Sequence, residues 1–167
     1  IQKFYIASDM CTDDMWMGNT TQDPGEYRDL AHYTGNTYNA GNACQNFWQY
    51  RYKGILRSNV AIEQIPKVVF ENESLKKRYI AEAKFLRAFH YFELVRNFGG
   101  VPLVLGLKLP SEITGIKRAT VEDTYAQIEK DLLEAIPDLP KRSEYDAMDL
   151  GRATKGAAQG YLAKAYL

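Results

Sequence analysis

The chain has 167 residues, which is long enough for one domain with its own hydrophobic core. Lys and Arg together number 21, and so do Asp and Glu, so the chain lacks the basic surplus that nucleic-acid binding requires. No segment approaches the roughly 20 consecutive apolar residues that a membrane-spanning helix needs.

Residues 1–41 form a loop-rich segment without sustained helical or strand periodicity. Residues 18–25 combine Gly, Asn, Asp and Pro, which favour turns. Loops as long as residues 8–41 are uncommon in compact domains unless they are functional or disordered. The aromatic residues in this segment favour an ordered loop.

Helical periodicity begins near Asn42 and predicts a first helix that extends to Ile65. Small and apolar side chains recur along it in steps of mostly three and four residues, and Pro66 ends it because proline cannot continue the backbone hydrogen bonding. Trp48 and Tyr52 lie one turn apart on this helix. We expect both to pack between helices.

A second helix is predicted from about Glu73 to Asn97, and it completes a helical hairpin over residues 42–98. Asn72 is placed to cap its first turn, and Gly99 is placed to end it in a left-handed conformation. The second half of this helix is apolar on nearly all sides, which predicts that it is the buried central helix.

Residues 99–104 are predicted to be an extended connector that leads to a second hairpin over residues 118–167. The first helix of that hairpin begins at Thr120 with the spacing of a capping box, and Pro137 ends it. The last helix begins near Thr154 and continues to the end of the chain.

The second and fourth predicted helices share a pattern of small residues. Aligning Ala83 with Ala158 also aligns Ala88 with Ala163. Small residues at these steps allow a neighbouring helix to approach closely, as in tetratricopeptide-type repeats. The alternative is two unrelated helices that are both rich in Ala. We expect an all-α fold of about four helices in tetratricopeptide-like hairpins, with a long N-terminal loop region.

Two stretches of the sequence resemble the SusD/RagB family. The first is the small-residue helix from Ala81 to Val95 together with the motif F-G-G-V-P-L-V at residues 98–104. The second covers residues 151–167. His90 and Gly100 depart mildly from the family pattern. The residues that carry the structural motif are Ala83, Arg87, Ala88, Tyr91, Gly99 and Pro102.

The resemblance implies a helical protein that is held at the outer membrane of Bacteroidetes-type bacteria by an N-terminal lipid. Such proteins bind nutrient, usually oligosaccharide, without catalysis and pass it to a SusC-like TonB-dependent transporter. We therefore expect a cell-surface lipoprotein with a glycan ligand, no catalytic residue, no metal and no cofactor. Full members are considerably longer, so we expect this chain to be a fragment that lacks the lipid-bearing N-terminus and the C-terminal half.

Sugar binding requires a flat aromatic ring against the apolar face of a pyranose and short polar side chains around its hydroxyl groups. The N-terminal loop region offers this mixture. The candidate ligand-binding residues are Trp16, Tyr33, Asn36, Tyr38, Asn39 and Asp14. Trp16 is the main candidate, because a large aromatic side chain in a polar loop suggests a role in binding. The alternative is that Trp16 packs the loop against the helices.

Three aspartates and the two cysteines of the chain have structural interpretations. Asp9, Asp13 and Asp14 lack the spacing of an EF-hand calcium loop, so we expect them to form loop and cap hydrogen bonds. Cys11 and Cys44 are compatible with either a disulfide or two thiols, and the sequence leaves both possibilities open.

The central helix carries ionisable residues that need partners if they are buried. We expect Arg87 to pair with a carboxylate such as Glu82 or Glu129, or to cap backbone carbonyl groups. His90 and Glu93 occur in the reverse order of a di-iron Glu-x-x-His motif and occur only once. We therefore expect His90 to be a core residue with one hydrogen-bond partner.

Two other functions compete with glycan capture. A peptide- or protein-binding helical-repeat scaffold at the cell surface would place its ligand in a concave helical groove and use the N-terminal loops only as cover. A glycosidase would need two carboxylates on either side of the scissile bond, and no carboxylate pair in this sequence lies in an aromatic cleft motif.

Overall fold

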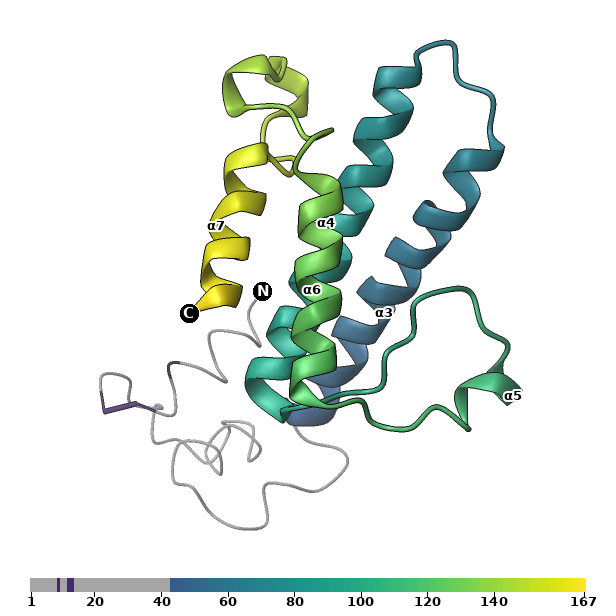
Figure 1. Cartoon of the computed structure of the whole chain (residues 1–167), viewed down its shortest axis with the longest axis vertical. Coiled ribbons are helices and arrows are strands. Elements are labelled where there is room, and N and C mark those ends of the chain that lie inside the picture. The colour runs from purple at the N-terminus through teal and green to yellow at the C-terminus, as the bar shows by residue number, and fades with distance from the viewer. Residues whose placement is uncertain (1–8, 10–11, 14–42) are drawn as a thin grey trace, which may run out of the picture. The chain divides into compact units, whose positions relative to one another are not determined.

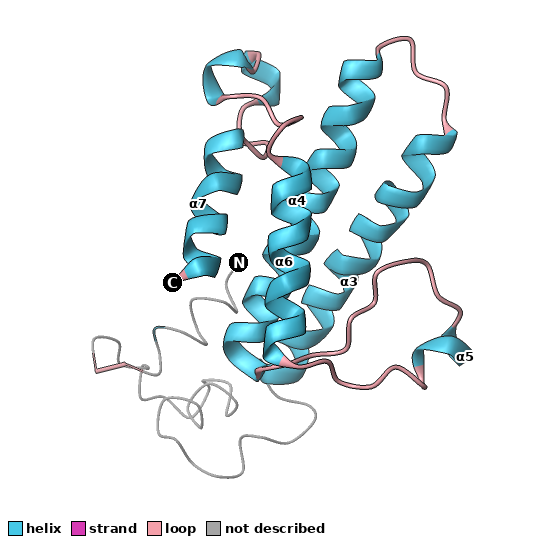
Figure 2. Ribbon diagram, in the orientation of Figure 1, coloured by secondary structure: helices cyan, strands magenta, loops and turns pink. Residues whose placement is uncertain are grey.

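The computed structural model describes residues 43–167 together with Asp9, Thr12 and Asp13. The chain divides into two compact units, residues 1–50 and residues 51–167. In the first unit, the Thr12 hydroxyl donates a hydrogen bond to the Asp9 carbonyl oxygen at 2.7 Å. The second unit is helical, and Figure 2 shows its helices joined by loops. The predicted all-α fold is confirmed.

Helix α3 spans Ala43–Gln64 and is followed by a single 3₁₀ turn, η2, at Ile65–Lys67. This turn contains Pro66, so the proline ends the α-helical hydrogen-bonding pattern as predicted. Helix α4 spans Glu73–Phe98, and the Asn72 side chain accepts a hydrogen bond from the backbone N–H of Leu75 at 3.1 Å. The predicted N-cap is therefore confirmed.

Gly99 ends α4 with φ of +70° and ψ of −147°. The positive φ explains the glycine, since other residues rarely adopt it. The ψ value, however, lies outside the left-handed helical region that the sequence predicted, because the chain leaves α4 directly into an extended connector. The Gly99 N–H still donates to the Val95 carbonyl oxygen at 2.9 Å.

Helix α6 spans Val121–Ala135 and helix α7 spans Lys155–Tyr166. The hydroxyl oxygens of Thr120 and Thr154 each accept a hydrogen bond from the first turn of the helix that follows. Both predicted helix starts are therefore confirmed. The shorter helical elements are α5 at Pro110–Ile113, η3 at Arg142–Glu144 and η4 at Ala147–Asp149.

Helix α4 lies at the centre of the second unit. Figure 1 shows residues 51–64 of α3 running beside α4 in the opposite direction, with α6 in front of α4 and α7 (yellow) beside α6 (green). Helix α6 packs on α4, and α7 packs mainly on α6. The fully buried side chains at these contacts include Tyr91, Leu94, Ile128, Leu132 and Ala158. The predicted burial of the second half of α4 is therefore confirmed.

Two glycines allow close approaches between segments that are distant in the sequence. A Cβ atom at Gly54 of α3 would lie 2.0 Å from Nε2 of His90 on α4. A Cβ atom at Gly100 would lie 2.1 Å from the carbonyl oxygen of Ala119. Both values are far below any real contact, so these positions admit only glycine without a local shift.

The aligned small residues have different environments in the two helices. Ala83 and Ala158 are both buried, whereas Ala88 is buried and Ala163 is exposed. The face of α7 that carries Ala163 is therefore exposed, whereas the corresponding face of α4, which carries Ala88, is buried. Within the described part of the chain, none of the helices combines the length and the hydrophobicity that are needed to cross a membrane.

Candidate functional site

The predicted ligand-binding residues lie outside the described residues. These are Trp16, Tyr33, Asn36, Tyr38, Asn39 and Asp14. Cys11 also lies outside them, so the pairing of Cys11 with Cys44 stays open. The structure describes the helical scaffold and the polar networks that hold its segments together.

The most buried of these networks centres on Arg87 of α4. Its Nε donates to Oδ2 of Asp131 at 2.7 Å, and its Nη2 donates to Oδ1 at 2.6 Å. Asp131 lies on α6 and is fully buried. The prediction that Arg87 pairs with a carboxylate is confirmed, but the predicted partners Glu82 and Glu129 are wrong. The packing of α6 turns Asp131 toward Arg87, whereas Glu82 binds Arg152.

Arg87 also connects α4 to α3 and to the connector that follows α4. Its Nη1 donates to Oδ1 of Asn59 at 2.9 Å and to the Leu105 carbonyl oxygen at 3.1 Å. Nδ2 of Asn59 donates in turn to the Val104 carbonyl oxygen at 2.8 Å. Burial alone would lower the pKa of Arg87, but the hydrogen bonds to Asp131 outweigh it and raise the pKa. The guanidinium group therefore stays charged.

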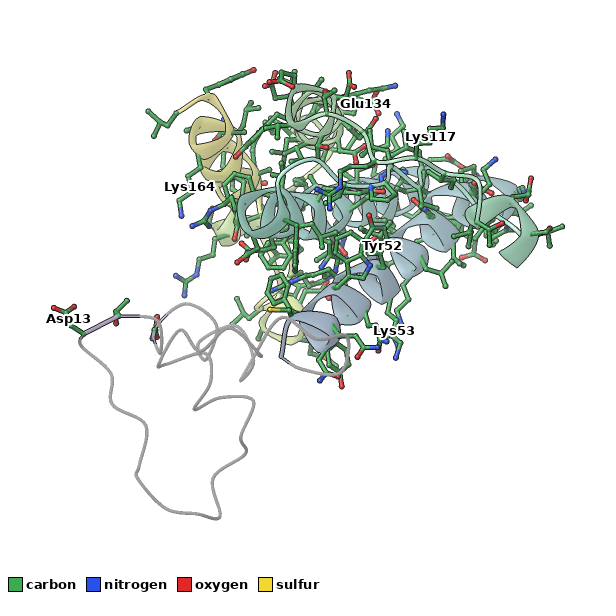
Figure 3. The ribbon with its side chains drawn as sticks, turned by 90° about the horizontal axis from the view of Figure 1, so that it is seen from below. Asp13, Tyr52, Lys53, Lys117, Glu134 and Lys164 are labelled. Carbon is green, nitrogen blue, oxygen red and sulfur yellow. The ribbon has the colours of Figure 1, made fainter. Side chains whose placement is uncertain are left out.

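Two tyrosines hold the same connector. The Tyr91 hydroxyl accepts a hydrogen bond from the Val104 N–H at 2.7 Å and lies 3.1 Å from the Val104 carbonyl oxygen. The Tyr52 hydroxyl donates to the Pro102 carbonyl oxygen at 2.7 Å. Tyr52 is half-buried, whereas the neighbouring Lys53 is exposed and lies at the outer edge of the view in Figure 3. Tyr52 is therefore structural, as predicted.

Tyr52, Asn59, Arg87 and Tyr91 together form what we call the connector clamp. Burial raises the pKa of Tyr91 to about 12, so its hydroxyl stays protonated and available for hydrogen bonding. The clamp satisfies carbonyl groups of a connector whose backbone forms an isolated antiparallel bridge between Pro102 and Arg118. Arg87 and Tyr91, two of the motif residues, thus help to fix the path of the chain between α4 and α6.

A second network ties the loop between α6 and α7 to α4. Nε of Arg152 donates to Oε1 of Glu82 at 3.0 Å. Nη2 of Arg78 donates to Oδ2 of Asp149 at 3.0 Å. The Tyr145 hydroxyl donates to the Ala153 carbonyl oxygen at 2.6 Å. The loop is therefore held to the helix by charged and polar contacts.

His90 departs from its prediction. Its ring packs against Gly54, but its Nδ1 is buried without a hydrogen-bond partner, so the predicted hydrogen bond is missing at this atom. Burial, together with the charge of Arg51, lowers the pKa of His90 to about 4. The His90 ring is held in place by its packing against Gly54 and not by a hydrogen bond at Nδ1.

Glu93, one turn further along α4, is buried among cations. Its carboxylate lies 3.9 Å from Nη2 of Arg51 and 3.8 Å from Nη1 of Arg96. Oε2 accepts no hydrogen bond, and burial raises the pKa of this carboxyl group. Among the described residues, no three His, Cys, Asp or Glu side chains come together as metal ligands would.

Comparison with protein families gives a match over residues 4–167. The matching family is SusD-like and is described as starch-binding and associating with the outer membrane. The chain is 33% identical to SusD-like protein P2 of Formosa agariphila over 122 residues, which is 72% of this chain and 23% of that protein. It is 37% identical to a SusD-like protein of Bacteroides ovatus over 98 residues, which is 58% of this chain and 17% of that protein.

Solved structures share the fold. A laminarin-binding SusD-like protein superposes with a TM-score of 0.78 at 35% identity, over 89% of this chain and 31% of that one. Surface glycan-binding protein A of Bacteroides uniformis gives a TM-score of 0.81 at 27% identity, over 96% and 35%. A structure with a xylogluco-oligosaccharide gives 0.75 at 27% identity, over 99% and 30%. The chain therefore spans about a third or less of each relative.

Proposed function

Because the chain belongs to the SusD-like family, we propose that it forms the helical scaffold of a non-catalytic protein that binds oligosaccharide or polysaccharide at the cell surface for nutrient uptake. The observation that carries this proposal is the superposition on the laminarin-binding SusD-like protein, over 89% of this chain at 35% identity. Fold alone does not imply function, so the proposal also rests on the 35% sequence identity within the superposed part of the chain.

The scaffold suits ligand binding because its segments are fixed before the ligand arrives. The connector clamp and the Glu82–Arg152 pair hold the hairpins in one arrangement, which limits the ordering cost of binding. We propose that the N-terminal loops supply the sugar contacts, with the ring of Trp16 stacked against a pyranose. We also propose that residues 42–98 and 118–167 act as two hairpins of one domain.

The proposed partner is a SusC-like TonB-dependent transporter, and the proposed location is the outer membrane, with attachment by a lipid at the N-terminus of the full-length protein. Support comes from the family, which is described as associating with the outer membrane. Co-purification of the full-length protein with a SusC-like transporter from the same organism tests the partnership. Recovery of each protein without the other, in mild detergent, would contradict it.

Retardation of the full-length protein in native gels that contain soluble polysaccharides tests the function itself. Laminarin, xyloglucan and starch form the first panel. We expect retardation by at least one of them, reduced in Trp16→Ala and unchanged in Tyr166→Ala, which alters an exposed aromatic residue of α7. An assay for new reducing ends should stay at background. Absence of retardation, with binding of a peptide library instead, would favour the helical-repeat scaffold.

A further inference from the structure

We draw no further inference here: the strongest candidate, the exposed apolar surface patch formed by Leu105, Leu107 and Leu109 in the segment before α5 and by Ile113 in α5, is an unpartnered face, and nothing in the structure shows what covers it.

Discussion

Arg87 of α4 and Asp131 of α6 form a bidentate ion pair, with distances of 2.7 and 2.6 Å and side chains that are 8% and 0% exposed. The pair joins the two predicted hairpins across their interface. Through Asn59 and the Leu105 carbonyl oxygen, the same guanidinium group also fixes α3 and the connector. The guanidinium group of one residue on α4 thus binds α3, α6 and the connector.

Replacing Asp131 with Asn should strongly destabilise the protein. The change leaves the buried guanidinium group of Arg87 without its counter-charge, which costs about 3–5 kcal/mol in comparable sites. Urea unfolding followed by circular dichroism measures the loss. The matched control is Glu134→Gln on the same helix. It removes the ion pair with Lys84, in which the Glu134 side chain is 42% exposed. Its cost should stay below about 1 kcal/mol, and equal costs would contradict the account.

Replacing Gly54 with Ala should destabilise the α3–α4 contact by about 1–3 kcal/mol, because the new Cβ atom would lie 2.0 Å from the His90 ring. Gly160→Ala in α7, where no atom lies within 4 Å of a Cβ, should stabilise the chain by up to about 1 kcal/mol. In a His90→Ala background the penalty at Gly54 should disappear. A penalty that persists there would show that the ring is not its cause.

Acid should weaken the fold through His90. Its pKa falls from 6.5 to about 4 on folding, so the unfolded chain binds more protons between these pH values. The stability contribution of the neutral imidazole is complete above pH 6.5 and is lost as the pH falls toward 4. The loss is about 3 kcal/mol in total, at about 1.4 kcal/mol per pH unit.

The variant His90→Phe isolates this effect, since it keeps a ring against Gly54 and removes the titrating group. The unfolding free energies of both proteins are measured from pH 7.5 to 4, and their difference is compared at each pH. Glu93, whose pKa is raised by burial, acts in the opposite direction but is common to both proteins. A difference that does not vary with pH would contradict the assignment to His90.

Replacing Tyr91 with Phe should loosen the connector while it leaves the core packing intact. The variant loses the hydroxyl that contacts both the N–H and the carbonyl oxygen of Val104. A cost of about 1–3 kcal/mol is expected, because the part-buried Val104 N–H loses its partner, whereas the Val104 carbonyl oxygen keeps the hydrogen bond from Asn59. Hydrogen exchange at the Val104 amide should accelerate selectively. Tyr166→Phe, at an exposed site on α7, should leave that exchange rate unchanged.

The sequence predicted the helices well because their signals are local. Pro66, Asn72, Thr120 and Thr154 act within one turn of their own positions, so their roles can be recognised without knowledge of the packing. Ile128, Leu132 and Ala135 recur along α6 in steps of four and three residues, and this apolar stripe is buried.

The partner of Arg87 depended on information that is not local. Which side of α6 faces α4 is set by the packing of both helices, and this rotation buries Asp131 and Thr124 beside the apolar residues. In the sequence, Asp131 is a polar residue inside the apolar stripe of α6, and this was the only indication that Asp131 is buried. The prediction that Arg87 pairs with Glu82 or Glu129 did not use this indication. The ligand-binding residues remain predictions for a different reason, since they lie outside the described residues.

The affinity of the full-length protein for oligosaccharides of the polysaccharide that retards it in native gels tests the central claim most directly. Calorimetric titration of the wild-type protein and of Trp16→Ala provides this measurement. Glycan capture by the N-terminal loops predicts saturable binding at a fixed stoichiometry, with a large loss of affinity in the variant. Binding of equal strength in both proteins would exclude Trp16 from the site, and the absence of saturable binding to any glycan would contradict the proposed function.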